Sequence, residues 1–138
     1  MQLAIEHTLA PDRIGQLLEL YAAAYWASHR TREDVERMLA QTDLVFVLID
    51  READRIVGFT RVLTDFVYRA MVFDVIVAPG ARERGLGRML LEAVVSSPRL
   101  AGVETLELTC QPELIAFYAR WGFTDRNEGS TLMRLKRR

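Results

Sequence analysis

Apolar and polar residues alternate along much of the chain, as they do in half-buried β-strands. The segments with this pattern, or with a high content of β-branched and aromatic residues, are residues 3–9 (LAIEHTL), 44–50 (LVFVLID), 55–63 (RIVGFTRVL), 103–109 (VETLELT) and 130–136 (STLMRLK). The polar residues 51–54 (READ) separate two of these segments and can turn the chain, which predicts an antiparallel hairpin. Residues 130–136 predict a closing strand.

Residues 70–78 (AMVFDVIVA) are nearly all apolar, which is typical of a central strand covered on both faces, and Pro79 and Gly80 follow it. The exception within this strand is Asp74. A buried carboxylate is costly unless it is paired or faces solvent. A functional cleft explains Asp74, and a salt bridge to Arg61 or Arg69 explains it equally well.

Four segments carry the helical spacing of apolar residues. They are residues 12–28 after Pro11, 32–41 with Thr31 as the N-terminal cap, 85–97 after a glycine-rich loop, and 112–121 from Pro112 to Gly122. Strands and helices therefore occur together, with an order of strand, glycine-rich loop and helix in the second half of the chain.

Composition limits the class of protein. The chain has 138 residues, of which half are apolar and 27% charged, with a formal net charge of −1 and one cysteine. These values predict a single domain over residues 1–138, and the absence of a large basic excess argues against nucleic-acid binding. One cysteine excludes a disulfide framework and a multi-cysteine metal site. No stretch approaches the length of a membrane span and the N-terminus lacks a leader pattern, so we expect no membrane association and a cytoplasmic location.

The loop PGARERGLGR at residues 79–88 places glycines beside three arginines, a combination suited to an anion. A nucleoside triphosphate loop would continue with Lys and Ser or Thr, and a dinucleotide loop would have glycine where this chain has Leu90. With these two kinds of phosphate loop excluded, the remaining candidate ligand is a diphosphate bound by backbone N–H groups at the helix start. The alternative is that Gly85 only turns the chain from strand to helix.

Two motifs carry a family resemblance. Arg82-x-x-Gly85-x-Gly87, preceded by VIVAP and followed by RMLLEAV, resembles the acetyl-CoA loop of the Gcn5-related N-acetyltransferases (GNAT), and FYARWGF downstream resembles their second signature. The resemblance implies an α/β (α+β) fold: a central mixed, mostly antiparallel sheet flanked by helices, with splayed central strands, as in small single-domain bacterial members. It implies acetyl-CoA as cosubstrate, CoA as product and no metal.

The same resemblance implies the site residues. Backbone groups of Val75, Ile76 and Val77 would hold the pantetheine arm and acetyl carbonyl. The pyrophosphate would lie in a cradle of Arg82, Glu83, Arg84, Gly85, Leu86, Gly87 and Arg88. Tyr118 matches the tyrosine that faces the leaving sulfur, so it is our candidate general acid, although a purely packing role on an aromatic helix is the alternative. Asp74 is the candidate base or the group that steers a cationic amine, and a water relay could replace it.

The acceptor pocket, by the same resemblance, would be built from the first two helices and the loop TDFVYR. Tyr25, Trp26, Asp65 and Phe66 are then candidate substrate-binding residues, while Tyr25 and Trp26 in the core and Asp65 as an ordinary surface group are the alternatives. We expect direct transfer of acetyl from acetyl-CoA to a primary amine of a small molecule or protein, by a monomer or homodimer. The alternatives are a non-catalytic acyl-CoA sensor and a nucleotide-binding regulator.

Overall fold

The computed structural model describes residues 1–81 and 84–138. Within it the chain forms two compact units, Met1–Leu108 and Thr109–Arg138.

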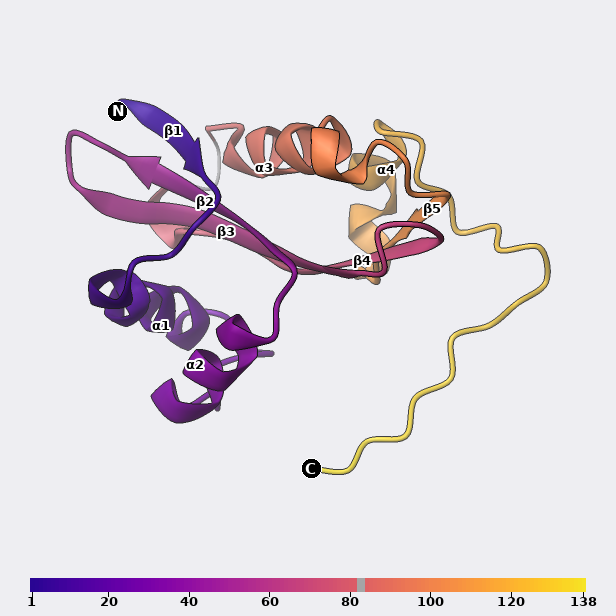
Figure 1. Ribbon diagram of the computed structural model, residues 1–138, viewed down its shortest axis with the longest axis horizontal. Helices are drawn as coiled ribbons and strands as arrows, with labels where there is room; N and C mark the ends of the chain where they lie inside the picture. The colour runs from indigo at the N-terminus through magenta and orange to yellow at the C-terminus, as the bar shows by residue number, and fades with distance from the viewer. Residues whose placement is uncertain (82–83) are drawn as a thin grey trace. The chain divides into compact units, whose positions relative to one another are not determined.

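The first unit is built on a five-stranded sheet (Figure 1). Its strands are β1 (Leu3–Glu6), β2 (Leu44–Asp50), β3 (Arg55–Thr64), β4 (Arg69–Val77) and β5 (Thr105–Glu107), and they lie in the order β1-β2-β3-β4-β5. Neighbours from β1 to β4 are antiparallel, and β4 pairs with β5 in parallel. The expected mixed and mostly antiparallel sheet is therefore confirmed.

Helices cover both faces of this sheet (Figure 1). The helices α1 (Ile14–Ala22) and α2 (Arg32–Ala40) lie on one face, and α3 (Leu86–Val95) lies on the other. Short 3-10 turns occupy Pro11–Arg13, Pro79–Ala81 and Pro98–Leu100.

Burial of apolar side chains explains both contacts of the sheet. On the α1 face, Leu17 and Tyr21 pack with Val47, Ile49 and Phe59 in one buried cluster. On the other face, α3 approaches so closely that a Cβ on Gly58 would lie 3.2 Å from Cδ1 of Leu90. Glycine at this point lets the helix pack directly on β3.

A β-bulge interrupts the pairing of β3 with β4. Phe59 pairs with Ile76 and Arg61 pairs with Phe73, so Thr60 alone faces both Asp74 and Val75. Asp74 adopts a φ of +57°, the left-handed conformation that aspartate tolerates better than most residues. The bulge therefore lies at the position where a charged residue enters the apolar strand.

The other edge of β4 is paired along only part of its length. β5 pairs with Arg69, Ala70 and Met71, and no described strand continues the ladder along residues 72–77. Backbone groups point alternately to the two edges of a strand, so several N–H and C=O groups of residues 72–77 lie on an open edge. This is the splayed arrangement that the family resemblance implied.

The second unit contains a 3-10 turn (Pro112–Leu114) and the helix α4 (Ile115–Ala119). The closing strand expected at residues 130–136 is wrong, because residues 131–138 have no regular secondary structure. An alternating pattern forms a strand only when another strand satisfies its backbone, and residues 130–136 pair with no described strand. Leu132, Met133 and Leu135 are consequently exposed.

The helix expected over residues 12–28 is shorter in the structure, because α1 ends at Ala22. Beyond it the chain continues in turns with i→i+3 hydrogen bonds, from Ala24 to Tyr21, Ala27 to Ala24 and Arg30 to Ala27. Tyr21, Ala24 and Ala27 are buried at this spacing of three residues. The apolar pattern thus fits an α-helix followed by turns, and interpreting all of it as one α-helix makes the predicted helix too long.

Candidate functional site

The open edge of β4 contains Val75, Ile76 and Val77, whose backbone groups are predicted from the family resemblance to bind the pantetheine arm. Ile76 is 6% exposed and belongs to the core beneath α1, so its side chain is not available to a ligand. Any contact from this position must come from its backbone. The bulge at Asp74 precedes these residues directly and sets the direction in which their N–H groups point.

The chain leaves β4 through a 3-10 turn and enters α3 at Gly85. Gly85 is the N-terminal cap, has a φ of +73° and provides no side chain to bond the first N–H groups of the helix. A Cβ at this position would meet no described atom within 4 Å, so there is open space beside the backbone. An anion placed there could accept hydrogen bonds from the helix start and interact favourably with its dipole.

The remaining residues of the predicted cradle divide into three groups. Leu86 and Gly87 begin α3; Leu86 is fully buried, so it can contribute only its backbone, and Gly87 is half-buried and has no side chain beyond its backbone. Arg84 and Arg88 are exposed and can reach solvent-borne anions. Arg82 and Glu83 lie outside the described residues.

Asp74 is the centre of a charged network that joins three elements. Its Oδ2 atom accepts hydrogen bonds from Nη1 of Arg30 over 2.7 Å, from Nε of Arg61 over 2.7 Å and from the hydroxyl of Tyr21 over 2.9 Å. Nη2 of Arg30 donates to Oδ1 over 3.3 Å. The carboxylate side chain is 5% exposed, so the carboxylate at the centre of this network is almost completely removed from water.

The network keeps Asp74 ionised. Burial by itself raises the pKa of a carboxyl group, but hydrogen bonds and charges from Arg30 and Arg61 outweigh that effect, and the pKa of Asp74 lies below its usual value. Burial and the nearby Asp74 charge raise the pKa of the Tyr21 phenol. A carboxylate with a lowered pKa that already accepts four hydrogen bonds is a weak proton acceptor. The predicted salt bridge between Asp74 and Arg61 is therefore confirmed. The role of Asp74 as a general base stays a prediction, and the hydrogen bonds and charges around the carboxylate disfavour it.

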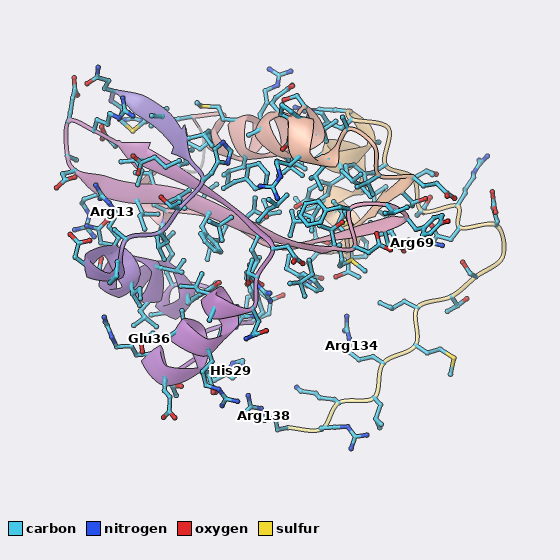
Figure 2. The ribbon with its side chains drawn as sticks, in the orientation of Figure 1. Arg13, His29, Glu36, Arg69, Arg134 and Arg138 are labelled. Atoms are coloured by element: carbon cyan, nitrogen blue, oxygen red, sulfur yellow. The ribbon has the colours of Figure 1, made fainter. Side chains whose placement is uncertain are left out.

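Arg69, the other proposed partner of Asp74, pairs elsewhere. Its Nη1 lies 2.7 Å from Oε1 of Glu107 on β5. Figure 2 shows Arg69 at the β5 end of the sheet, away from His29 and Glu36 on the side of α1 and α2. The alternative prediction, a salt bridge between Asp74 and Arg69, is therefore wrong.

Tyr118 lies on α4 in the second unit, where its ring contacts Phe117 and Phe123 edge to face. The packing role considered for this residue is thus present. Burial, with a smaller effect of Cys110, raises the pKa of the Tyr118 phenol to about 12. The phenol is protonated at neutral pH, as a general acid must be before it donates.

Tyr25 and Trp26 lie in the connection between α1 and α2. Tyr25 is 77% exposed and Trp26 is 40% exposed, so the alternative that places them in the core is wrong. The guanidinium of Arg30 lies over the Trp26 ring at 5.5 Å and over the Tyr21 ring at 4.7 Å. The exposed aromatic surface of this connection therefore adjoins the Asp74 network.

Asp65 and Phe66 form the turn between β3 and β4, which Figure 1 shows beside β5 and away from α1 and α2. Oδ1 of Asp65 accepts from the backbone N–H groups of Val67, Tyr68 and Arg69. These bonds lower the pKa of Asp65 and fix the turn. The carboxylate thus has a structural task, and the described structure does not bring these two residues to Tyr25 and Trp26.

Sequence analysis missed Arg30 and the polar role of Tyr21. Arg30 ends the aromatic segment AYWASHR, and nothing in its local pattern distinguishes it from a solvated surface arginine. The signal was indirect, because a carboxylate in a buried strand requires a cationic partner. Only the fold shows that one partner comes from the connection between α1 and α2.

Two further classes of site find no support among residues 1–81 and 84–138. No group of three or more His, Cys, Asp or Glu side chains in this part of the chain could hold a metal ion. Within the same residues, every helix is too short or too polar to cross a lipid bilayer.

Comparison with known proteins extends these observations. The model of the acetyltransferase (GNAT) family matches residues 12–123. Serotonin N-acetyltransferase 2 of rice (Oryza sativa) is 33% identical over 112 residues, which cover 80% of this chain and 56% of the rice protein. Glucosamine 6-phosphate N-acetyltransferase 1 of rice is 34% identical over 104 residues, which cover 71% of this chain and 63% of that protein. The chain thus spans less than two thirds of the length of each of these two relatives.

Among solved structures, a GNAT-family acetyltransferase of Streptococcus pneumoniae superposes with a TM-score of 0.80. The two chains are 22% identical, and the superposition covers 99% of each. This similarity confirms the fold.

Proposed function

Because the chain belongs to the GNAT family of acetyltransferases, we propose that it transfers the acetyl group of acetyl-CoA to a primary amine of a small molecule or protein. The observation that carries this proposal is the open edge of β4. On the edge of β4 that faces away from β3, residues 72–77 lack a strand partner among the described residues, and an extended ligand with amide groups can bond such an edge as another strand would.

Two further features fit acetyl-CoA. The pantetheine arm contains amides and is extended, as the edge requires. The helix start at Gly85 lies a few residues beyond the end of β4 and offers uncapped N–H groups with open space beside them. The exposed guanidinium groups of Arg84 and Arg88 supply positive charge for a diphosphate. The edge and the helix start together suit a ligand with an amide arm and a pyrophosphate.

Acetyl-CoA supplies a thioester whose carbonyl carbon is attacked by the amine nitrogen. A backbone N–H at Val75 or Val77 stabilises the negative charge that develops on the carbonyl oxygen, because it is held by the strand and needs no rearrangement. The C–N bond forms and the C–S bond breaks, and Tyr118 donates its phenolic proton to the departing sulfur. The proton lost by the amine leaves through water, since the Asp74 carboxylate is already bonded by two arginines and a tyrosine.

The test is transfer itself. The purified chain is incubated with acetyl-CoA and a panel of primary amines, and release of free thiol is followed with the acetylated product. Amine-dependent thiol release is the expected result. Thermal stabilisation by acetyl-CoA and CoA without transfer to any amine would support the acyl-CoA sensor instead. Stabilisation by ATP or NAD alone would contradict both.

A further inference from the structure

The guanidinium of Arg30 uses one of its two bidentate edges and leaves the other open. Arginine has five N–H donors, and pairs of them lie on the Nη1/Nη2 edge and on the Nε/Nη2 edge. The first edge binds both oxygens of Asp74, and Nη1 also approaches Sδ of Met38 at 3.9 Å. Among the described residues, the hydrogen bonds to Asp74 and Met38 use neither the Nε–H group nor the second Nη2–H group, and the Tyr21 hydroxyl also interacts with the guanidinium.

The Arg30 side chain is partly accessible, and its guanidinium is held in position. The Arg30 side chain is 24% exposed, whereas that of Asp74 is 5% exposed. The bonds to Asp74 and the rings of Tyr21 and Trp26 restrict the orientation of the guanidinium. A group that is already ordered loses little conformational entropy when it binds a ligand.

The charge of the network favours an anion. Two guanidinium groups, those of Arg30 and Arg61, share the single carboxylate of Asp74. One positive charge is therefore in excess, and a second cation would be repelled rather than steered. A carboxylate or phosphate has two oxygens at the spacing that an arginine edge requires.

The network also lies next to the proposed reaction centre. Asp74 directly precedes Val75, one of the two residues whose N–H is proposed to stabilise the acetyl carbonyl, and consecutive Cα atoms are about 3.8 Å apart. An anionic group bound to Arg30 would therefore belong to a molecule that reaches the acetyl group. The exposed ring of Trp26 adjoins the same guanidinium.

From this geometry we infer that Arg30 determines acceptor specificity by binding an anionic group, a carboxylate or a phosphate, on the acceptor amine. The inference rests on the proposed acetyl transfer for the identity of the ligand as an acceptor. Asp74 is then a positioning residue that orients the Arg30 fork.

Matched amines test this inference. Tryptamine and L-tryptophan differ by a carboxylate, and glucosamine and glucosamine 6-phosphate differ by a phosphate, so the two pairs separate the two anions. The wild type should show a kcat/KM at least about tenfold higher for the anionic member of one pair, as expected for a charged hydrogen-bonded contact. Arg30→Gln should remove that preference, and Arg30→Lys should keep only part of it because lysine lacks the fork.

The control is Arg32→Gln, which removes an arginine two residues away that pairs with Glu36 on the surface of α2. This variant should keep the preference. Equal or better turnover of the neutral members by the wild type would overturn the inference while leaving acetyl transfer intact.

A second measurement does not depend on turnover or on the stability of the Arg30 variants. In the wild type, the NMR signal of the Arg30 Nε–H group should shift saturably with inorganic phosphate or acetate and not with chloride at equal ionic strength. A shift no larger than that caused by chloride would overturn the inference. If the anions shift this signal but no amine is acetylated, the anion site stands and the proposed transfer fails.

Discussion

Arg61 on β3 donates from Nε to Oδ2 of Asp74 on β4 over 2.7 Å, across the bulge that separates the two strands. The same oxygen binds Arg30 from the connection between α1 and α2. One carboxylate therefore ties the bulged strand both to its neighbour and to the segment that carries the exposed aromatic side chains. Asp74 therefore stabilises both the bulged conformation of β4 and the orientation of the Arg30 guanidinium.

Asp74→Ala should lower the free energy of unfolding by about 3–5 kcal/mol, because it leaves two largely buried guanidinium groups without their carboxylate. Asp74→Asn should cost less, since asparagine tolerates positive φ and keeps an oxygen acceptor. Urea denaturation with an unchanged m-value measures both. The control is Asp54→Ala, because Asp54 has a φ of +52° and pairs with Arg13 but is 83% exposed. A loss for Asp74→Ala no greater than that of the control would contradict the network.

The stability contributed by Asp74 should disappear in acid. Its folded-state pKa lies below the ordinary value of 3.8, so its contribution is complete above that value and is lost as the pH falls through the folded pKa. The difference in unfolding free energy between wild type and Asp74→Asn should therefore be constant from neutral pH to about pH 5 and shrink below pH 3.8. Urea titrations at a series of pH values measure this difference. A difference that does not change with pH would mean that the carboxylate is not held in its charged form.

Much of the fold follows from local pattern, and the exceptions have physical causes. The hairpin of β2 and β3 and the Thr31 cap, whose hydroxyl accepts from the N–H of Asp34 over 3.2 Å, are determined by neighbours in sequence. Residues 130–136 have an equally clear strand pattern, yet a strand also requires a partner that no local pattern reveals. The end of α1 was missed because the apolar positions beyond Ala22 continue at a spacing of three.

The residues of the candidate site also differ in whether the local sequence reveals their role. The loop at Gly85 could be identified because a backbone with positive φ favours glycine, so the residue type itself indicates the conformation. The unusual chemistry of Asp74 could be recognised, but its partner Arg30 could not, since 44 residues separate them. Asp65 looked like a polar group for a substrate, whereas its oxygen bonds three backbone N–H groups of its own turn.

Gly85→Ala should raise the Kd for acetyl-CoA at least about tenfold, because it places a side chain at a φ of +73° and fills the space beside the helix start. Calorimetric titration measures the affinity. Gly129→Ala introduces similar strain at a φ of +84°, and Gly80→Ala adds a methyl group in open space within the same loop. Both controls should bind acetyl-CoA as the wild type does. Unchanged affinity in Gly85→Ala would show that this glycine serves only the turn.

Tyr118→Phe should lower kcat by about a hundredfold, the usual contribution of a general acid, and change the Kd for acetyl-CoA little. Because the pKa of the phenol is raised to about 12, the wild type should show no alkaline loss of kcat from this group below about pH 10. Steady-state kinetics with a verified acceptor measure both effects. The control is Tyr68→Phe, which removes a phenol that is 62% exposed in the β3–β4 turn. Unchanged turnover of Tyr118→Phe would leave this residue only its packing role.

The most direct test of the account is amide hydrogen exchange of β4 with and without acetyl-CoA. Amides among residues 72–77 that face the open edge should exchange rapidly in the free protein and become protected when acetyl-CoA binds, since a ligand then accepts their hydrogen bonds. Amides of β2, which is paired on both sides, should change little. Saturating acetyl-CoA that leaves the exchange of residues 72–77 unchanged would contradict the proposal that this edge holds the acetyl donor.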